Sequence, residues 1–417
     1  MYDKASLALI PSGTKAGTLY SVLAANGDGD FTHTRATSAT RVNKDGLIES
    51  VASGVPRLDY PLIDGVVQDC PALLLEPSRT NIALYSEDFT NSVWSKTRST
   101  ITGNQAVSPD GSVTADKITG TGTGTSYFYD GFSVTSGTVY TISIFAKKIN
   151  VNNFYINNFT QSGSITFDLS DGTIDTSASG TFSDGKIENY GNDWYRLSVQ
   201  YTASATATVN IGFYGQDSTL DAAYVWGAQI ETGSYTTSYI PTTTSTVTRN
   251  ADVCNGAGTS AEFNDSEGVL YVETSKLSTS ENGGVAISNG SYTYRVVLFF
   301  DTSGNVRGQV YSNGEQANII TSGLDYTNNN KLALKYSATS TKFFVNGFQI
   351  GSTDTSSTMP IGLSELAFDD GGGGSDFYGK TKQLMTFNQA LTDSELEQIT
   401  SWTSFGEMAK GQLYTIE

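Results

Sequence analysis

The residue types that most enzymes use for chemistry are scarce in this chain. His33 is the only histidine in 417 residues, and Cys70 and Cys254 are the only cysteines. A Ser/His/Asp triad would depend on His33, and a zinc centre on two distant thiols outside any CxxC spacing. The composition therefore argues against most hydrolase mechanisms, and we expect His33 to be structural or surface-exposed.

Carboxylates are the one abundant reactive group, with 42 Asp and Glu residues. A glycosidase needs only two of them, about 5 to 10 Å apart, so a glycan depolymerase stays open as an alternative function. An acidic string of the form E-x-D-x-x-E does not occur in the sequence. We therefore expect no catalytic residues and no enzymatic activity.

One glycine-rich segment gathers three carboxylates at its two ends: Asp369, Asp370 and Asp376 flank Gly371–Gly374. Oxygen ligands of this kind suit calcium, so these three residues are the candidate metal ligands. The alternative is a solvated loop whose glycines relieve backbone strain between two strands. Apart from calcium, we expect no cofactor.

Aromatic side chains provide the candidate binding site. In the run Tyr127-Phe128-Tyr129, successive side chains of a strand point to opposite faces, so at least one ring faces solvent. Tyr155 and Asn157 lie in a nearby run and offer a further ring and an amide for sugar hydroxyl groups. We interpret Tyr127, Tyr129, Tyr155 and Asn157 as glycan contacts, with ordinary packing on a sheet face as the alternative.

The charge balance bears on which partners are expected. The chain has 24 basic residues against 42 acidic ones, a formal charge of −18, and no cluster of Lys or Arg. Nucleic acid is therefore not an expected partner. No apolar stretch reaches 18 residues, and the apolar run at Leu7–Ile10 is too short for a signal peptide, so we expect cytoplasmic synthesis without membrane insertion.

The periodicity of the sequence predicts an all-β protein. Short runs rich in Val, Ile, Thr, Tyr and Phe alternate with Gly, Asn, Asp and Ser clusters. Two-residue turns at Asn346-Gly347, Asn289-Gly290 and Asp171-Gly172 predict the pairs Val345 with Phe348, Ile287 with Tyr292, and Leu169 with Ile174. One short helix is predicted after Thr392, which forms a capping box with Glu395.

Breaks in this pattern divide the chain into three segments. Pro71 and Pro77 interrupt an apolar run near residue 80, and the stretch PTTTST from Pro241 is typical of a linker. We expect a small N-terminal region at residues 1–80. Antiparallel jelly-roll sandwiches are then expected at residues 81–250 and 251–417.

The first segment resembles the N-terminal region of phage virion proteins, most of them tail-fibre or structural components. The resemblance rests on LALIPSGTKAGTLYSVL at residues 7–23 and CPALLLEPSRTN at residues 70–81. It implies that residues 1–80 attach the protein to other virion proteins or hold its copies together. The expected location is the virion.

The other two segments resemble β-sandwich modules. NIALYSEDFTNSVWSK at residues 81–96 and the stretch YVWGAQIETGSYTTSYIP from residue 224 are similar to the carbohydrate-binding-like sandwich of such phage proteins. LALKYSATSTKFFVNGFQIGS at residues 332–352 and GKTKQLMTFNQALTDSELEQIT at residues 379–400 are similar to the concanavalin-like, laminin-G-like jelly roll.

These resemblances imply a phage tail fibre, head fibre or spike whose sandwiches bind surface glycans. Its partners would be other virion proteins, glycans and further copies of itself, with a trimer favoured. Several weak sites held together would make attachment durable. Two alternatives remain, a glycan depolymerase and a capsid or tail decoration protein that binds no glycan.

Overall fold

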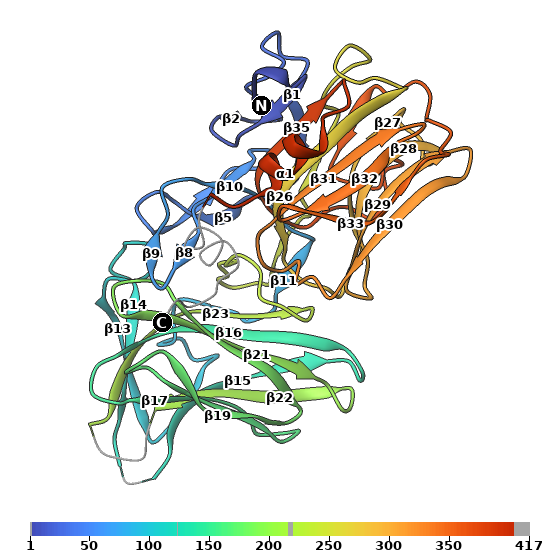
Figure 1. Cartoon of the computed structure of the whole chain (residues 1–417). Coiled ribbons are helices and arrows are strands. Elements are labelled where there is room, and N and C mark those ends of the chain that lie inside the picture. Colours follow the sequence, from blue (N-terminus) through green and yellow to red (C-terminus); the bar gives the residue numbers. More distant parts are fainter. Residues whose placement is uncertain (1, 123, 216–219, 404–417) are drawn as a thin grey trace.

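The computed structural model describes residues 2–122, 124–215 and 220–403, and it shows two β-sandwiches in separate lobes (Figure 1). The strand pairings that build both sandwiches are antiparallel. The expected all-β class is therefore confirmed. Among the described residues, no helix is long and apolar enough to cross a membrane.

The first sandwich has two six-stranded sheets around one core. We call them the front sheet and the back sheet. In spatial order, the front sheet contains β12 (Ser95–Thr97), β15 (Ser126–Val134), β22 (Ala207–Gly215), β17 (Asn153–Asn158), β18 (Gly163–Asp168) and β19 (Thr173–Gly180). The back sheet contains β13 (Ser99–Ala106), β14 (Ala115–Gly120), β23 (Ala222–Thr232), β16 (Val139–Lys148), β21 (Trp194–Thr202) and β20 (Phe182–Asn189). Apolar side chains from both sheets, all between Ala83 and Ile230, form the core.

The second sandwich packs an eight-stranded sheet against a five-stranded sheet. The eight-stranded sheet runs β33 (Phe348–Asp354), β32 (Thr341–Val345), β31 (Asn330–Ser337), β26 (Glu267–Lys276), β35 (Gly379–Phe387), β10 (Ala72–Leu75) and β7 (Arg57–Asp59), with β1 (Leu7–Leu9) also on β35. The five-stranded sheet runs β30 (Glu315–Ser322), β29 (Asn305–Ser312), β28 (Tyr294–Phe300), β27 (Gly283–Ser288) and β34 (Glu365–Ala367).

The first eighty residues are built into this second sandwich. β1 and β10 both pair with β35, through Leu7↔Thr386 and Leu73↔Thr381. Leu9, Leu73 and Leu75 are almost fully buried in the core of the second sandwich. β35 therefore completes its backbone hydrogen bonds with strands that lie more than 300 residues earlier in the chain. The predicted boundary near residue 80 falls between strands of the same sheet.

The remaining strands form small sheets, one beginning beside the N-terminus and others lying between the lobes (Figure 1). They are β2 (Thr14–Lys15), β3 (Thr18–Leu19), β4 (Phe31–Thr34) and β25 (Val253–Asn255) in one sheet, and the pairs β5 (Ala39–Val42) with β6 (Ile48–Val51), β8 (Leu62–Ile63) with β9 (Val66–Val67), and β11 (Arg79–Asn81) with β24 (Val247–Arg249).

A buried cluster of charged side chains ties the first eighty residues to the stretch after the linker. Asp252 accepts hydrogen bonds from the Arg57 guanidinium, from Arg35 Nη1 at 2.9 Å and from the Glu76 backbone N–H at 2.9 Å. His33 Nε2 lies 3.1 Å from Asp252 Oδ1. Burial opposes ionisation of Asp252, but Arg57 and His33 outweigh it, and the pKa of Asp252 is lowered. Of the two expectations for His33, the structural one is confirmed, because the side chain is buried against Asp252.

Glu76 extends the cluster to the end of the first sandwich. Its carboxylate accepts hydrogen bonds from Arg57 Nη1 at 2.5 Å and Ser238 Oγ at 2.6 Å, and Arg249 Nη1 lies 2.9 Å away. Burial raises the pKa of Glu76, but Arg249 and Arg57 outweigh this effect and lower it to about 2. The cluster thus joins all three segments through ionised, buried groups.

Two of the three predicted hairpin registers are wrong. At Asn346-Gly347 the pairs Val345↔Phe348 and Phe343↔Ile350 are confirmed. Ile287 instead pairs with Val296, and Ile174 pairs with Phe167, not with Leu169. Both turns are longer than two residues because Ser288 Oγ and Asp168 Oδ1 accept hydrogen bonds from backbone N–H groups within the loop.

The predicted C-terminal helix is confirmed, and a 3₁₀ turn, η1 (Tyr2–Lys4), lies at the other end of the chain. Helix α1 (Asp393–Thr400) begins after Thr392, whose side chain and that of Glu395 form the expected capping box. Leu396 is buried and packs with Phe344 and Met385, so the helix covers the outer face of the eight-stranded sheet.

Candidate functional site

The front sheet presents aromatic side chains on its outer face. Along β15, Phe128 and Phe132 are buried in the core, while Tyr127 and Tyr129 are half-buried on the opposite face. Tyr155 on β17 shares this outer face. The alternation therefore places the predicted rings outside the core, as the sequence suggested.

Strand register brings all four predicted residues together. β22 lies between β15 and β17, and its Gly212 pairs with Tyr129 on one side and with Asn157 on the other. In the neighbouring row, Tyr127 and Tyr155 lie on either side of the same β22 residue. Because neighbouring strands are about 4.8 Å apart, the four side chains occupy one continuous patch two rows deep.

Phe159 joins this patch. It is 43% exposed, and its ring centroid lies 4.7 Å from that of Tyr127 and 6.2 Å from that of Tyr129. A Cβ atom on Gly212 would lie 2.2 Å from Phe159 Cε2, so only glycine allows the ring to lie over β22. The sequence analysis missed Phe159, although it continues the period of two from Tyr155 and Asn157. We call Tyr127, Tyr129, Tyr155, Asn157 and Phe159 the aromatic patch.

The surroundings of the aromatic patch are polar, and two carboxylates lie at one end of the face. Asp168 on β18 pairs with Asn153, whose side chain donates to Asp175 Oδ2 at 3.4 Å. The outward residues of the central strands include Ser133, Asn153, Thr208 and Asn210, and none of these carries a charge. Farther along the face, the Ser164 and Ser179 hydroxyl groups lie 2.9 Å apart on β18 and β19. Aromatic faces surrounded by hydroxyl and amide groups can stack on the C–H face of a sugar and hydrogen-bond its hydroxyl groups.

The three candidate metal ligands lie in the loop between β34 and β35. Asp369 Oδ1 accepts a hydrogen bond from Gly371 N at 2.6 Å, and Asp370 Oδ1 accepts from Gly374 N at 3.1 Å. Asp376 Oδ2 accepts a hydrogen bond from the Tyr378 hydroxyl group at 3.1 Å. Burial raises the pKa of Asp369 and of Asp376. In the part of the chain that the structure describes, no three His, Cys, Asp or Glu residues are grouped so that they could hold a metal ion.

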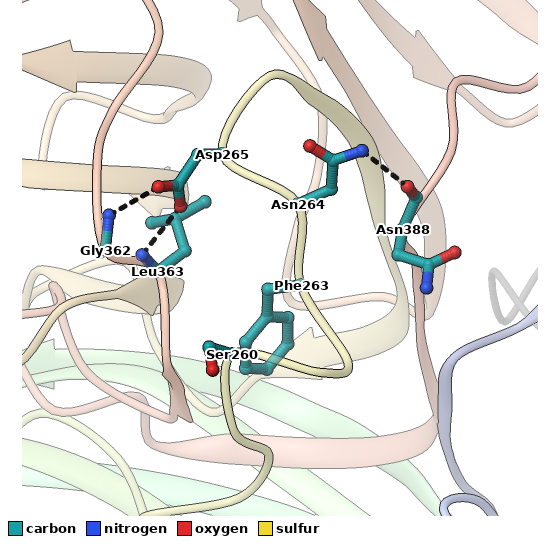
Figure 2. A pocket seen from close by; sticks show the side chains of 7 residues that line it. All are labelled: Ser260, Phe263, Asn264, Asp265, Gly362, Leu363 and Asn388. Atoms are coloured by element: carbon teal, nitrogen blue, oxygen red, sulfur yellow. Dashed lines mark hydrogen bonds between the residues drawn. The ribbon is translucent and has the colours of Figure 1, made fainter.

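The second sandwich has a pocket of about 400 Å³ at one end, lined by Ser260, Phe263, Asn264, Asp265, Gly362, Leu363 and Asn388 (Figure 2). The two Asp265 carboxylate oxygens accept hydrogen bonds from the backbone N–H groups of Gly362 and Leu363, at 2.7 and 2.9 Å. Asn264 Nδ2 donates to the Asn388 carbonyl at 3.0 Å. These contacts engage the carboxylate in loop structure, so the aromatic patch is the stronger candidate for ligand binding.

Comparison with protein families classifies the second sandwich. Residues 269–397 match the family model Laminin_G_3, described as the concanavalin A-like lectin/glucanases superfamily. These residues form a concanavalin A-like domain. The eight-stranded sheet of this domain also includes β1, β7 and β10, which lie outside the matched range. The expected laminin-G-like fold is thereby confirmed for the C-terminal segment.

Similar solved structures include carbohydrate-binding modules. The CBM40 module of a Ruminococcus gnavus sialidase, bound to α2,3-sialyllactose, is 16% identical, with 33% of this chain and 84% of that chain covered and a TM-score of 0.29. A leech intramolecular trans-sialidase is 15% identical, with 34% and 24% covered and a TM-score of 0.28. Domains LG4-5 of the mouse laminin α1 chain are 10% identical, with 65% and 89% covered and a TM-score of 0.24. No curated protein matches the sequence. None of these likenesses assigns a ligand to this chain.

Proposed function

We propose that the chain binds glycans through the aromatic patch on the outer face of the front sheet. The observation that carries the proposal is the contact of Tyr127, Tyr129 and Phe159 on a polar, solvent-facing sheet surface. Side chains buried for stability alone would be expected on the inner face, where the sheet already has Phe128 and Phe213. Rings on the outer face add little to the core but suit a flat ligand.

The proposal extends to a virion surface protein of the tail-fibre, head-fibre or spike type. Its support is the resemblance of residues 1–80 to the N-terminal region of phage virion proteins. Since β1 and β10 are occupied by pairing with β35, contact with other virion proteins would use the exposed parts of this region. The hairpin of β8 and β9 offers such a surface, because Val66 is 63% exposed. A homotrimer would multiply weak sites and slow dissociation.

The test is retention of the full chain on a glycan array, with Tyr129→Ala as the binding variant. Tyr20→Ala is the matched control, because Tyr20 is also a partly exposed tyrosine but lies outside the first sandwich. We expect Tyr129→Ala to lower retention at least tenfold, equivalent to about 1.4 kcal/mol, and Tyr20→Ala to have no effect.

Two other results would replace the proposal. If an oligomer of the wild-type chain is retained by no glycan, a decoration role without glycan binding becomes the better account. If reducing ends appear when the chain is incubated with a polysaccharide, and an acid-to-amide variant abolishes their release, the protein is a depolymerase.

A further inference from the structure

The five-stranded sheet of the second sandwich carries an unusual arginine on its outer face. Arg295 on β28 is 2% exposed, and its guanidinium carbon lies 3.3 Å from the ring centroid of Tyr292 and 4.0 Å from that of Tyr311. Tyr292 belongs to the loop between β27 and β28, where the sequence had predicted a two-residue turn. The longer loop is what places this ring over the guanidinium.

Arg295 has few hydrogen-bond partners. Nη1 donates to the Tyr292 carbonyl at 2.7 Å, whereas Nε is buried and has no partner. No ion pair among the described residues includes Arg295. Arg307 on the same face, by contrast, is paired with Asp301 at 2.7 Å. A guanidinium has five N–H donors, and a buried charge without a counter-ion is costly.

The stacking restricts how a ligand can approach this group. Ring contacts from Tyr292 and Tyr311 cover the guanidinium, so a ligand can reach it only at its edge. Because Nε is buried, that edge is the one formed by the two Nη groups. Edge-on approach in the guanidinium plane is the geometry in which carboxylates and sulfates form two parallel hydrogen bonds with arginine. The rings also hold the plane in one orientation, which lowers the entropy lost on binding.

The surroundings fit a sugar that carries such an anion. A Cβ atom on Gly371 would lie 3.2 Å from Arg295 Cδ, so the glycine-rich segment borders the arginine with backbone alone. Beside Tyr311, the Glu315 carboxylate opposes an anionic ligand, but hydrogen bonds from Tyr311, Gln309 and Asn318 at 3.1 to 3.2 Å already engage it. Tyr292 is 56% exposed and offers ring surface next to the charge.

We propose that Arg295, with Tyr292 and Tyr311, forms a second glycan site that binds the carboxylate or sulfate group of an acidic sugar. This site goes beyond the function proposed above, because it lies in the other sandwich and takes a charged ligand. It depends on neither the aromatic patch nor a virion location. The carboxylate and the sulfate share the same chemistry at the guanidinium edge.

The test measures binding of matched acidic and neutral oligosaccharides to the full chain by calorimetry. Oligogalacturonate is compared with its methyl ester, and dextran sulfate oligosaccharides with unmodified dextran, so that only the charge differs within each pair. We expect at least one acidic member to bind tenfold more tightly than its neutral counterpart. Which pair shows the preference identifies the anion.

Variants then assign the preference to the site. Arg295→Met should abolish it, and Arg295→Lys should weaken it, because lysine keeps the charge without the planar fork. Arg307→Gln, which removes the same charge from the same face, should change affinity less than twofold. Tyr129→Ala should leave acidic binding unchanged, which separates this site from the aromatic patch.

Equal affinity for acidic and neutral members in both pairs would overturn the proposal, and so would an unchanged preference in folded Arg295→Met. If Arg295→Met does not fold, the preference for acidic oligosaccharides is measured in Tyr292→Ala instead. The exposed ring of Tyr292 can be removed with little loss of packing. A preference that Tyr292→Ala leaves intact would then contradict the site.

Discussion

The two sandwiches are assembled in opposite ways. Both sheets and the whole core of the first sandwich come from one continuous stretch, between Ala83 and Thr232. The second sandwich draws β1, β7 and β10 from the first eighty residues, and Leu7, Leu73 and Leu75 are part of its core. A region that looks like an appendage in the sequence is therefore a structural part of a domain two hundred residues away.

Their outer faces differ as well. The front sheet of the first sandwich carries rings among hydroxyl and amide groups, whereas the five-stranded sheet of the second carries a guanidinium in contact with two tyrosine rings. Similar sandwich scaffolds thus present two different chemistries. The comparison teaches that ligand choice depends on the few side chains pointing outward from each sheet, and not on the sandwich itself.

Deletion of residues 1–80 should have the largest effect on stability, and it should affect the second sandwich but not the first. A chain starting at residue 81 keeps the whole core of the first sandwich but exposes the β35 edge and removes buried leucines from the second. We expect protease resistance and slow hydrogen exchange to persist in residues 82–245 and to be lost in residues 260–400. Native-like protection in both parts would show that the second sandwich does not need these strands.

Asp252→Asn should destabilise the junction strongly. The substitution removes the counter-ion of Arg35 and one of the two carboxylates that pair with Arg57, and both arginines are buried. Breaking a buried ion pair in this way costs about 3–5 kcal/mol. Chemical denaturation measures the loss.

Asp45→Asn is the control for this prediction. Asp45 pairs with Lys44 at the surface, where such pairs contribute at most about 1 kcal/mol. If both variants lost the same free energy of unfolding, the buried cluster would contribute no more to stability than a surface ion pair.

The same cluster predicts how stability depends on pH. The pKa of Glu76 is lowered to about 2 from 4.5, so unfolding takes up a proton between these values. Its contribution is fully present above about pH 4.5 and is lost as the pH falls toward 2. We expect thermal denaturation to show this loss in the wild type and a flatter profile over the same range in Glu76→Gln. A wild-type midpoint that stays constant from pH 4.5 to pH 2 would contradict the assignment.

Local sequence patterns were enough to predict which face of a strand a side chain occupies and one hairpin register. Contacts between residues far apart in the chain could not be predicted. The alternation around Phe128 was enough to place Tyr127 and Tyr129 on one face, and Asn346-Gly347 fixed its hairpin register. The turn at Asn289-Gly290 was predicted wrongly, because a hydrogen bond from the Gly290 backbone N–H to Ser288 Oγ stabilises a longer loop. The pairing of β1 and β10 with β35 joins residues more than 300 positions apart, and no spacing rule in the sequence relates residues at that separation.

The candidate sites show the same limit. Phe159 lies one residue beyond the end of β17, and only the absence of a side chain at Gly212 explains its position over β22. The pairing of Asp252 with Arg57 joins residues 195 positions apart. Arg295 was not singled out in the sequence because its two ring contacts depend on the loop that carries Tyr292 and on the neighbouring strand β29.

The most direct test of the central claim is titration of the glycan selected on the array into wild-type chain, Phe159→Ala and Phe348→Ala. Both phenylalanines are exposed, at 43% and 74%, so neither substitution should unfold the protein, and Phe348 lies in the other sandwich. The account predicts at least a tenfold loss of affinity for Phe159→Ala and none for Phe348→Ala. Equal affinity of the wild type and Phe159→Ala would contradict glycan binding at the aromatic patch.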